Sequence, residues 1–129
     1  MLKFVIPLNP VTKKNGNVRT KNGVIPSKAY RKYEHDALLV IPPKARKHIR
    51  TPVNIKATYY TKIDYIHSDA RIDLTNLHNA LCDVLVAAGV IADDNCKIVC
   101  SMDGSRVKHD RRNPRTEIEI EEITCLDEF

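Results

Sequence analysis

The sequence predicts an α+β fold in which a small mixed β-sheet packs against two main helices. Three observations predict it: segments with strand-like patterns, one strongly amphipathic segment of helical periodicity, and loops rich in Asn, Gly and Pro between them. The expected order is strand, helix, strand, helix, strand, strand, with no internal repeat. A chain of 129 residues has the length of one ordinary domain, so we expect residues 1–129 to fold as one.

Signals for a strand, a loop and a helix follow one another in the first half of the chain. Residues 2–8 are mostly apolar and predict the first strand. Residues 11–23 contain two Asn-Gly pairs among Lys and Arg side chains, which is typical of a basic loop or hairpin. Ser27 can cap a helix that runs to about Ile41, because apolar residues recur there at helical spacing and two prolines follow.

The second half contains the clearest helix of the chain. Residues 52–62 alternate apolar and polar side chains and predict a strand. The helix covers about residues 74–88, with Asp73 at the N-cap position and Gly89 at the position of a C-terminal glycine. Its buried stripe is expected to contain Leu74, Leu77, Leu81, Val84, Leu85 and Ala88. Two closing strands are expected at 96–109 and 115–123.

Charge is unevenly distributed along the chain, whose net charge is +5. Residues 1–50 contain 12 Lys and Arg against two acidic residues, which gives +10. Residues 51–129 contain nine Lys and Arg against 14 acidic residues, which gives −5. Such a distribution suits an enzyme that acts on a polyanion, with basic groups for phosphates and carboxylates for metal ions. An unevenly charged solvated surface is equally compatible with it.

Composition and cysteine usage exclude several classes of protein. With 43% hydrophobic and 29% charged residues, the chain resembles a soluble globular protein rather than a disordered one. It lacks the run of about 18 apolar residues that a membrane span needs, and its start lacks the apolar core of a signal peptide. We therefore expect a cytoplasmic protein without a membrane partner. The four cysteines form no CxxC pair, which favours reduced structural thiols over a zinc site.

Three carboxylates bracket the second helix: Asp73 precedes it, and Asp93 and Asp94 follow it. Magnesium binds hard oxygen ligands, usually one or two carboxylates together with water and substrate phosphates. Arg71 and Lys97 stand close by in the sequence and could offset the repulsion between carboxylates and DNA. By spacing alone, Asp73 is more simply a helix cap and the Asp-Asp pair a solvated turn.

The segment from Asp73 to Asp94 carries a longer pattern, D-L-x-N-L…D-x-L…A-G…D-D, which closely resembles the RusA family of Holliday junction resolvases. The flanks resemble it too: Pro10 to Asn15, Ser27 with Tyr30-Arg31, and Pro114 to Ile120. The resemblance implies a homodimeric, Mg²⁺-dependent endodeoxyribonuclease without an organic cofactor. Such an enzyme makes paired nicks in branched DNA, the four-way junction, during recombination and repair. Genes of this kind are common in phages and prophages.

Carried over residue by residue, the resemblance makes Asp73 the first catalytic and metal-binding aspartate, Asp94 the last, and Asp93 their acidic neighbour. The sequence departs from the family pattern at two positions. Thr75 stands where the pattern has a second aspartate, and Asn79 stands where it has a lysine. Asp69, His67 or Asp93 could compensate for the lost carboxylate, and Lys13 or Lys14 for the lost lysine. The expected DNA-binding residues are Thr12, Lys13, Lys14, Asn15, Arg19, Lys21 and Arg71, and the expected supporting residues are Thr75, Asn76 and Asn79.

The length of the second helix constrains the site. A helix of about 15 residues spans roughly 22 Å, whereas carboxylates that share two metals lie within about 8 Å of one another. The chain after Gly89 therefore folds back along the helix, or Asp94 comes from a second subunit, and we favour the fold-back. For Asp83, on the same helix, a buried or interfacial hydrogen-bond acceptor is the simpler role.

Two other functions remain open from the sequence. One is a branched-DNA-binding protein whose catalysis is impaired because Thr75 brings no charge. The other is a small protein-interaction module whose Glu-rich end, residues 117–128, binds a partner. Edge strands often carry such charges simply to stay soluble.

Overall fold

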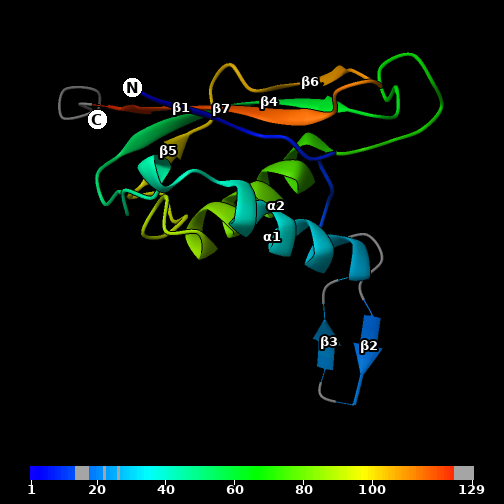
Figure 1. Ribbon diagram of the computed structural model, residues 1–129, viewed down its shortest axis with the longest axis horizontal. Coiled ribbons are helices and arrows are strands. Elements are labelled where there is room, and N and C mark those ends of the chain that lie inside the picture. The colour runs from blue at the N-terminus through cyan, green and yellow to red at the C-terminus, as the bar shows by residue number, and fades with distance from the viewer. Residues whose placement is uncertain (14–17, 22, 26, 124–129) are drawn as a thin grey trace.

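The computed structural model describes residues 1–13, 18–21, 23–25 and 27–123. It contains a five-stranded mixed sheet and two main helices, so the predicted α+β class is confirmed (Figure 1). The elements in chain order are β1 (Leu2–Ile6), β2 (Val18–Thr20), β3 (Gly23–Ile25), α1 (Lys28–Val40), the 3₁₀ turn η1 (Pro43–Ala45), β4 (Val53–Thr61), α2 (Leu74–Ala87), β5 (Val99–Ser101), β6 (Arg106–His109) and β7 (Arg115–Glu122).

The main sheet is built around β4 and β7. β7 pairs antiparallel with β1 on one side and with β4 on the other, and β5 and β6 both pair parallel with the far edge of β4. In register, Phe4 lies opposite Ile118, and Ile118 lies opposite Ala57. All three side chains are buried, as the period of two along a strand requires when one face of a sheet is covered. The basic segment forms a separate two-stranded hairpin, β2–β3.

The strand expected at 96–109 is two short strands instead. Gly104, with a φ of +83°, allows the chain to turn between them. Asn54 of β4 holds this turn, because its amide oxygen accepts from the Asp103 N–H at 2.7 Å and from the Ser101 hydroxyl at 2.6 Å. A long-range side-chain contact therefore interrupts a pattern that by itself predicts one continuous strand.

Both helices cover the same face of the sheet (Figure 1). The stripe of α2 is buried as predicted from Leu77 to Ala88, but Leu74 is 37% exposed, so its expected burial was wrong. Leu74 is the first residue of the helix, before the turns that pack on the core. Ser27 caps α1 as predicted, its hydroxyl accepting from the Tyr30 N–H at 3.2 Å. Gly89 has a φ of +74°, as its position after α2 requires.

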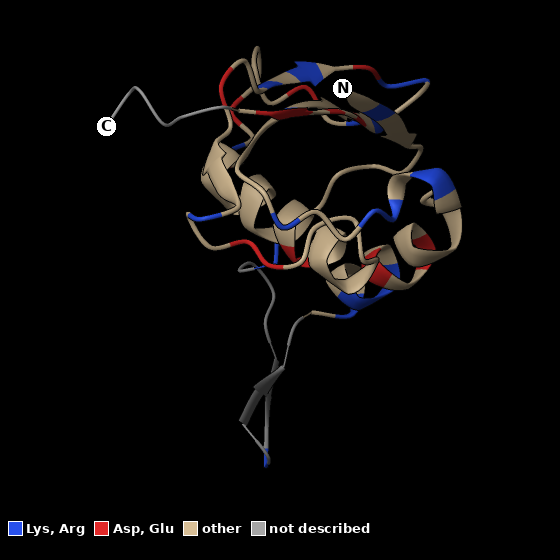
Figure 2. Cartoon of the chain, turned by 90° about the vertical axis from the view of Figure 1, so that its left-hand side faces the viewer, with Lys and Arg blue, Asp and Glu red and all other residues tan. Residues whose placement is uncertain are grey.

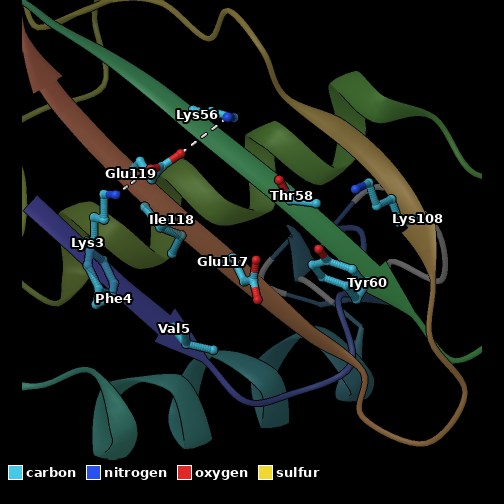
Figure 3. A pocket seen from close by; sticks show the side chains of 10 residues that line it. All are labelled: Lys3, Phe4, Val5, Lys56, Thr58, Tyr60, Lys108, Glu117, Ile118 and Glu119. Atoms are coloured by element: carbon cyan, nitrogen blue, oxygen red, sulfur yellow. Dashed lines mark ion pairs between the residues drawn. The ribbon is translucent and has the colours of Figure 1, made fainter.

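The other face of the sheet is polar and open. Figure 3 shows Lys3, Lys56 and Glu119 side by side on three neighbouring strands, with Glu119 paired to Lys3 at 3.2 Å and to Lys56 at 3.4 Å. Further along the same face, the Arg115 guanidinium lies 3.8 Å from the centre of the Tyr60 ring. The alternation of Ile and Glu in β7 thus places isoleucines against the helices and glutamates among basic side chains on the open face.

One polar contact ties α2 to the sheet from inside. The Tyr59 hydroxyl and His78 Nδ1 lie 2.6 Å apart, and Tyr59 is buried. Burial lowers the pKa of His78 and raises the pKa of Tyr59. Both shifts favour a neutral imidazole that accepts a hydrogen bond from the phenol.

We predict that His78 stays neutral at pH 7, with a pKa below its ordinary value of 6.5. The unfolded chain protonates this imidazole first as the pH falls, so it binds more protons than the folded chain below about pH 6.5. Its contribution therefore makes folding stability decrease on acidification. Measurement of urea unfolding midpoints between pH 5 and 7 should show a smaller decrease for His78→Gln than for the parent, and an NMR titration midpoint at or above 6.5 would contradict the prediction.

Leu81→Ala should lower the free energy of unfolding by about 2–5 kcal/mol, because it opens a cavity where α2 packs on the sheet. Leu81 is only 1% exposed. The matched control is Leu39→Ala on α1, where the leucine is 74% exposed, and its effect should stay within about 0.5 kcal/mol. Equal losses in urea denaturation of the two variants would show that α2 does not supply the core contact described above.

Candidate functional site

Asp73 occupies the N-cap position of α2, but its carboxylate does not cap the helix. Its backbone carbonyl accepts the first helical hydrogen bond, from the Leu77 N–H at 3.1 Å, while the side chain makes no capping bond. Instead, Asp73 Oδ2 accepts from the Asn76 side-chain amide at 3.3 Å. The carboxylate is therefore exposed at the positive end of the helix dipole and remains accessible to a ligand.

A hollow next to Asp73 brings three charged side chains together. It is lined by Tyr65, Ser68, Asp69, Ala70, Arg71, Ile72 and Asp73. Two carboxylates and one guanidinium thus share one open space, where a cation and a phosphate group could both find partners. Of the residues suggested to replace the missing carboxylate, Asp69 lies in this hollow.

His67 does not line this hollow and contacts a different carboxylate. His67 Nδ1 lies 3.1 Å from Asp64 Oδ2, and the other oxygen of Asp64 accepts from the backbone N–H groups of Ile66 and His67 at 3.0 Å each. These hydrogen bonds, led by the one from the His67 N–H, lower the pKa of Asp64. Asp64 therefore organises the loop between β4 and α2, and His67 belongs to that turn.

Asp93 and Asp94 differ in their surroundings although they are adjacent. Asp93 Oδ1 accepts from the Asp94 N–H at 2.7 Å, and its Oδ2 accepts from the Asn95 amide at 3.0 Å, so Asp93 shapes the turn. The Asp94 side chain is exposed, and within the described part of the chain its carboxylate makes no hydrogen bond or ion pair. Asp94 is therefore the more available ligand of the two.

The charge of Asp94 acts on a buried thiol of α2. Burial raises the pKa of the Cys82 thiol to about 12, and the negative charges of Asp94 and Asp83 add to that shift. Asp94 thus lies within electrostatic reach of Cys82, which is inside α2. Cys82 is nine residues from Asp73, or about 14 Å along the helix axis. Among the residues that the structure describes, no group of three or more His, Cys, Asp or Glu side chains is placed to hold a metal ion.

A polar stripe runs along α2 from the end at which Asp73 stands. Thr75 and Asn79 are exposed and stand one turn apart, and Asp83 follows one further turn along. Asn76 lies beside this stripe and holds Asp73. The supporting residues expected from the sequence therefore occur on the outward side of α2, opposite its buried leucines.

The structure describes only some of the residues that were expected to bind DNA. The Lys13 ammonium is paired with Asp83 at 2.7 Å and stays partly exposed. Thr12 is partly buried, Lys21 is exposed, and Arg71 lines the hollow at Asp73. Lys14, Asn15 and the side chain of Arg19 lie outside the described residues. The sequence did not predict the pairing of Lys13 with Asp83. Its only signals for that pair were a basic loop and an acidic position on a helix.

Within the described part of the chain, basic and acidic residues do not segregate to two opposite faces. Figure 2 shows Lys and Arg segments interspersed with Asp and Glu segments on both the sheet and the helix layer. The pairing of Lys3 and Lys56 with Glu119 is one local reason. Positive charge available to a polyanion is therefore a matter of individual positions such as Arg71.

Comparison with known proteins identifies the family of the chain. No curated protein matches the chain, and no helix within the described residues is both long and apolar enough to cross a membrane. The family described as endodeoxyribonuclease RusA matches residues 7–121, nearly the whole chain. That match spans both helices, the hollow at Asp73 and all strands of the main sheet except β1 and the last residue of β7. The chain therefore belongs to the RusA family of Holliday junction resolvases, and it is an endodeoxyribonuclease that hydrolyses phosphodiester bonds in DNA.

Proposed function

We propose that the chain acts as a single domain, as a Mg²⁺-dependent enzyme that resolves four-way DNA junctions by paired nicks. Its setting would be recombination and repair in the cytoplasm, and its gene would derive from a phage or prophage. The observation that carries the proposal is the Asp73 carboxylate, which stands at a helix start without capping it and shares a hollow with Asp69 and Arg71. A carboxylate kept out of a favourable capping bond is available for a ligand.

The residues present fit a divalent cation. Exposed carboxylate oxygens are the donors that Mg²⁺ prefers, usually from one or two residues, and Asp73 and Asp69 supply them at the hollow. When bound, such an ion lowers the pKa of a water molecule and stabilises the leaving oxygen of a phosphodiester. The chain itself orients the reaction: Asn76 fixes the Asp73 carboxylate, and Arg71 offers a guanidinium that can hold a phosphate in two hydrogen bonds. No organic cofactor is required for this chemistry.

Resolution of a four-way junction requires two symmetric cuts and hence two sites, which a homodimer provides. We propose that Asp73 and Asp94 of the same chain serve one site. The electrostatic effect of Asp94 on the Cys82 thiol supports a position of Asp94 beside the same helix that Asp73 begins.

A branched-DNA-binding protein without catalysis is the second candidate. It is favoured by Thr75, which adds no charge on the exposed side of α2, and by the lack of a three-ligand cluster among the described residues. Binding without Mg²⁺-dependent cutting would identify it. A protein-interaction module is less favoured, because the β7 glutamates Glu117 and Glu119 pair with basic side chains of the same sheet.

Asp73→Asn and Asp94→Asn should each slow the cutting of a synthetic mobile four-way junction by at least about a hundredfold, because each removes a charged oxygen ligand. The measurement is single-turnover cleavage in Mg²⁺ with saturating protein. Asp103→Asn is the matched control, since it removes an exposed carboxylate from the turn between β5 and β6. We would abandon the site if Asp73→Asn cut as fast as the parent.

Mixed dimers test whether one chain supplies both carboxylates. A heterodimer of one Asp73→Asn subunit and one Asp94→Asn subunit should remain inactive, because each site then lacks one carboxylate. If each site instead drew on both subunits, one of the two sites would be fully intact. Restored nicking of one strand at roughly half the parent rate would therefore exclude the single-chain arrangement.

A further inference from the structure

Lys13 and Asp83 form an ion pair that joins distant parts of the chain. Lys13 Nζ lies 2.7 Å from Asp83 Oδ2, although 70 residues separate them. The two side chains keep 40% and 34% of their surface exposed. The pair therefore lies at the rim of the molecule, where a large ligand can reach the ammonium.

A second contact restrains the same ammonium from the side of α1. Lys13 Nζ lies 5.6 Å from the centre of the Tyr30 ring, close enough for a cation–π interaction. Tyr30 is itself held in place, because it is buried and its hydroxyl donates to Glu34 at 3.0 Å. Lys13 is thus held between one side chain of α1 and one of α2.

The held position coincides with the candidate site. Asp83 continues the exposed stripe of Thr75 and Asn79, one turn beyond Asn79. The Lys13 ammonium, 2.7 Å from Asp83 Oδ2, is therefore held on the polar side of α2, two turns beyond Thr75 on the helix that Asp73 begins.

We propose that Asp83 is a positioning residue for junction binding, an inference that rests on the proposed function. It holds the Lys13 ammonium at the edge of α2, from where Lys13 contacts a DNA phosphate. An ammonium has three N–H donors and Asp83 takes one of them, so the others can serve a phosphate. A lysine restrained before binding loses less rotamer entropy when it meets the phosphate.

This proposal predicts that removal of a negative charge weakens the binding of DNA. A carboxylate beside DNA ordinarily repels it, so removal of Asp83 would be expected to tighten binding. If Asp83 positions Lys13, its removal weakens binding instead. Asp83→Asn should raise the Kd for a four-way junction about fivefold, the cost of ordering one long side chain on binding.

The experiment measures junction binding in EDTA over a range of salt concentrations. Lys13→Gln should also weaken binding, and it should reduce the slope of log Kd against log salt by about one phosphate contact. Asp83→Asn should keep the slope of the parent, because Lys13 still reaches the phosphate. The double variant should bind no more weakly than Lys13→Gln alone, and Asp83→Glu should restore most of the affinity.

The matched control breaks another Lys–Asp pair of similar length. Asp36→Asn removes the partner of Lys32, at 2.8 Å within α1, and should not weaken binding. Circular dichroism would verify that each variant is folded. If Asp83→Asn does not fold, the Lys13→Gln variant, in which Asp83 is intact, still tests the proposal. An affinity and a salt slope equal to those of the parent would overturn it.

Other outcomes separate this inference from the proposed function. A parent that cuts junctions in Mg²⁺, with an Asp83→Asn variant that binds equally well or more tightly, would overturn the positioning role alone. A parent that binds no junction would overturn both. A change in thermal midpoint without a change in Kd would show that the pair serves only stability, and would also overturn the proposal.

Discussion

The packing of α2 on the inner face of the sheet is the contact on which the geometry of the site depends. Leu77, Leu81 and Leu85 have almost no exposed surface, and together they determine how the helix is rotated about its own axis. Once that rotation is set, Thr75 and Asn79 must face outward, because they lie on the opposite side of a helix of 3.6 residues per turn. The polar stripe of the proposed site is thus a consequence of apolar burial on the reverse side.

The two ends of α2 differ: the C-terminal end has a stabilising cap, and the N-terminal end leaves a carboxylate accessible. At the C-terminal end, Gly89 ends the helix with a positive φ, as in many stable helices. At the N-terminal end, the Asp73 side chain gives up a capping hydrogen bond, which is ordinarily worth about 1 kcal/mol. That stabilisation is recovered elsewhere, through buried contacts such as those of Leu81. A helix start of this kind keeps a carboxylate available to a cation and still places it reproducibly.

The two faces of the sheet have different roles. Its inner face carries the apolar side chains that hold the helices, and its outer face is covered by ion pairs and by the stacking of Arg115 on Tyr60. The glutamates of β7 therefore offset basic residues of the neighbouring strands. Among the described residues, this local compensation intersperses basic with acidic side chains.

The sequence by itself determined the two helices, the Ser27 cap, the Gly89 turn and the inward side of each long strand, because these depend on spacing between near neighbours. It also determined the family, through the spaced pattern from Asp73 to Asp94. Only the structure decided that Asn54 splits one expected strand in two, that the Asp73 side chain turns to Asn76 instead of capping its helix, and that Lys13 pairs with Asp83. The contacts of Asn54 and Lys13 join groups that meet only when the sheet and helices pack, and residues 70 positions apart leave no periodic trace in a sequence.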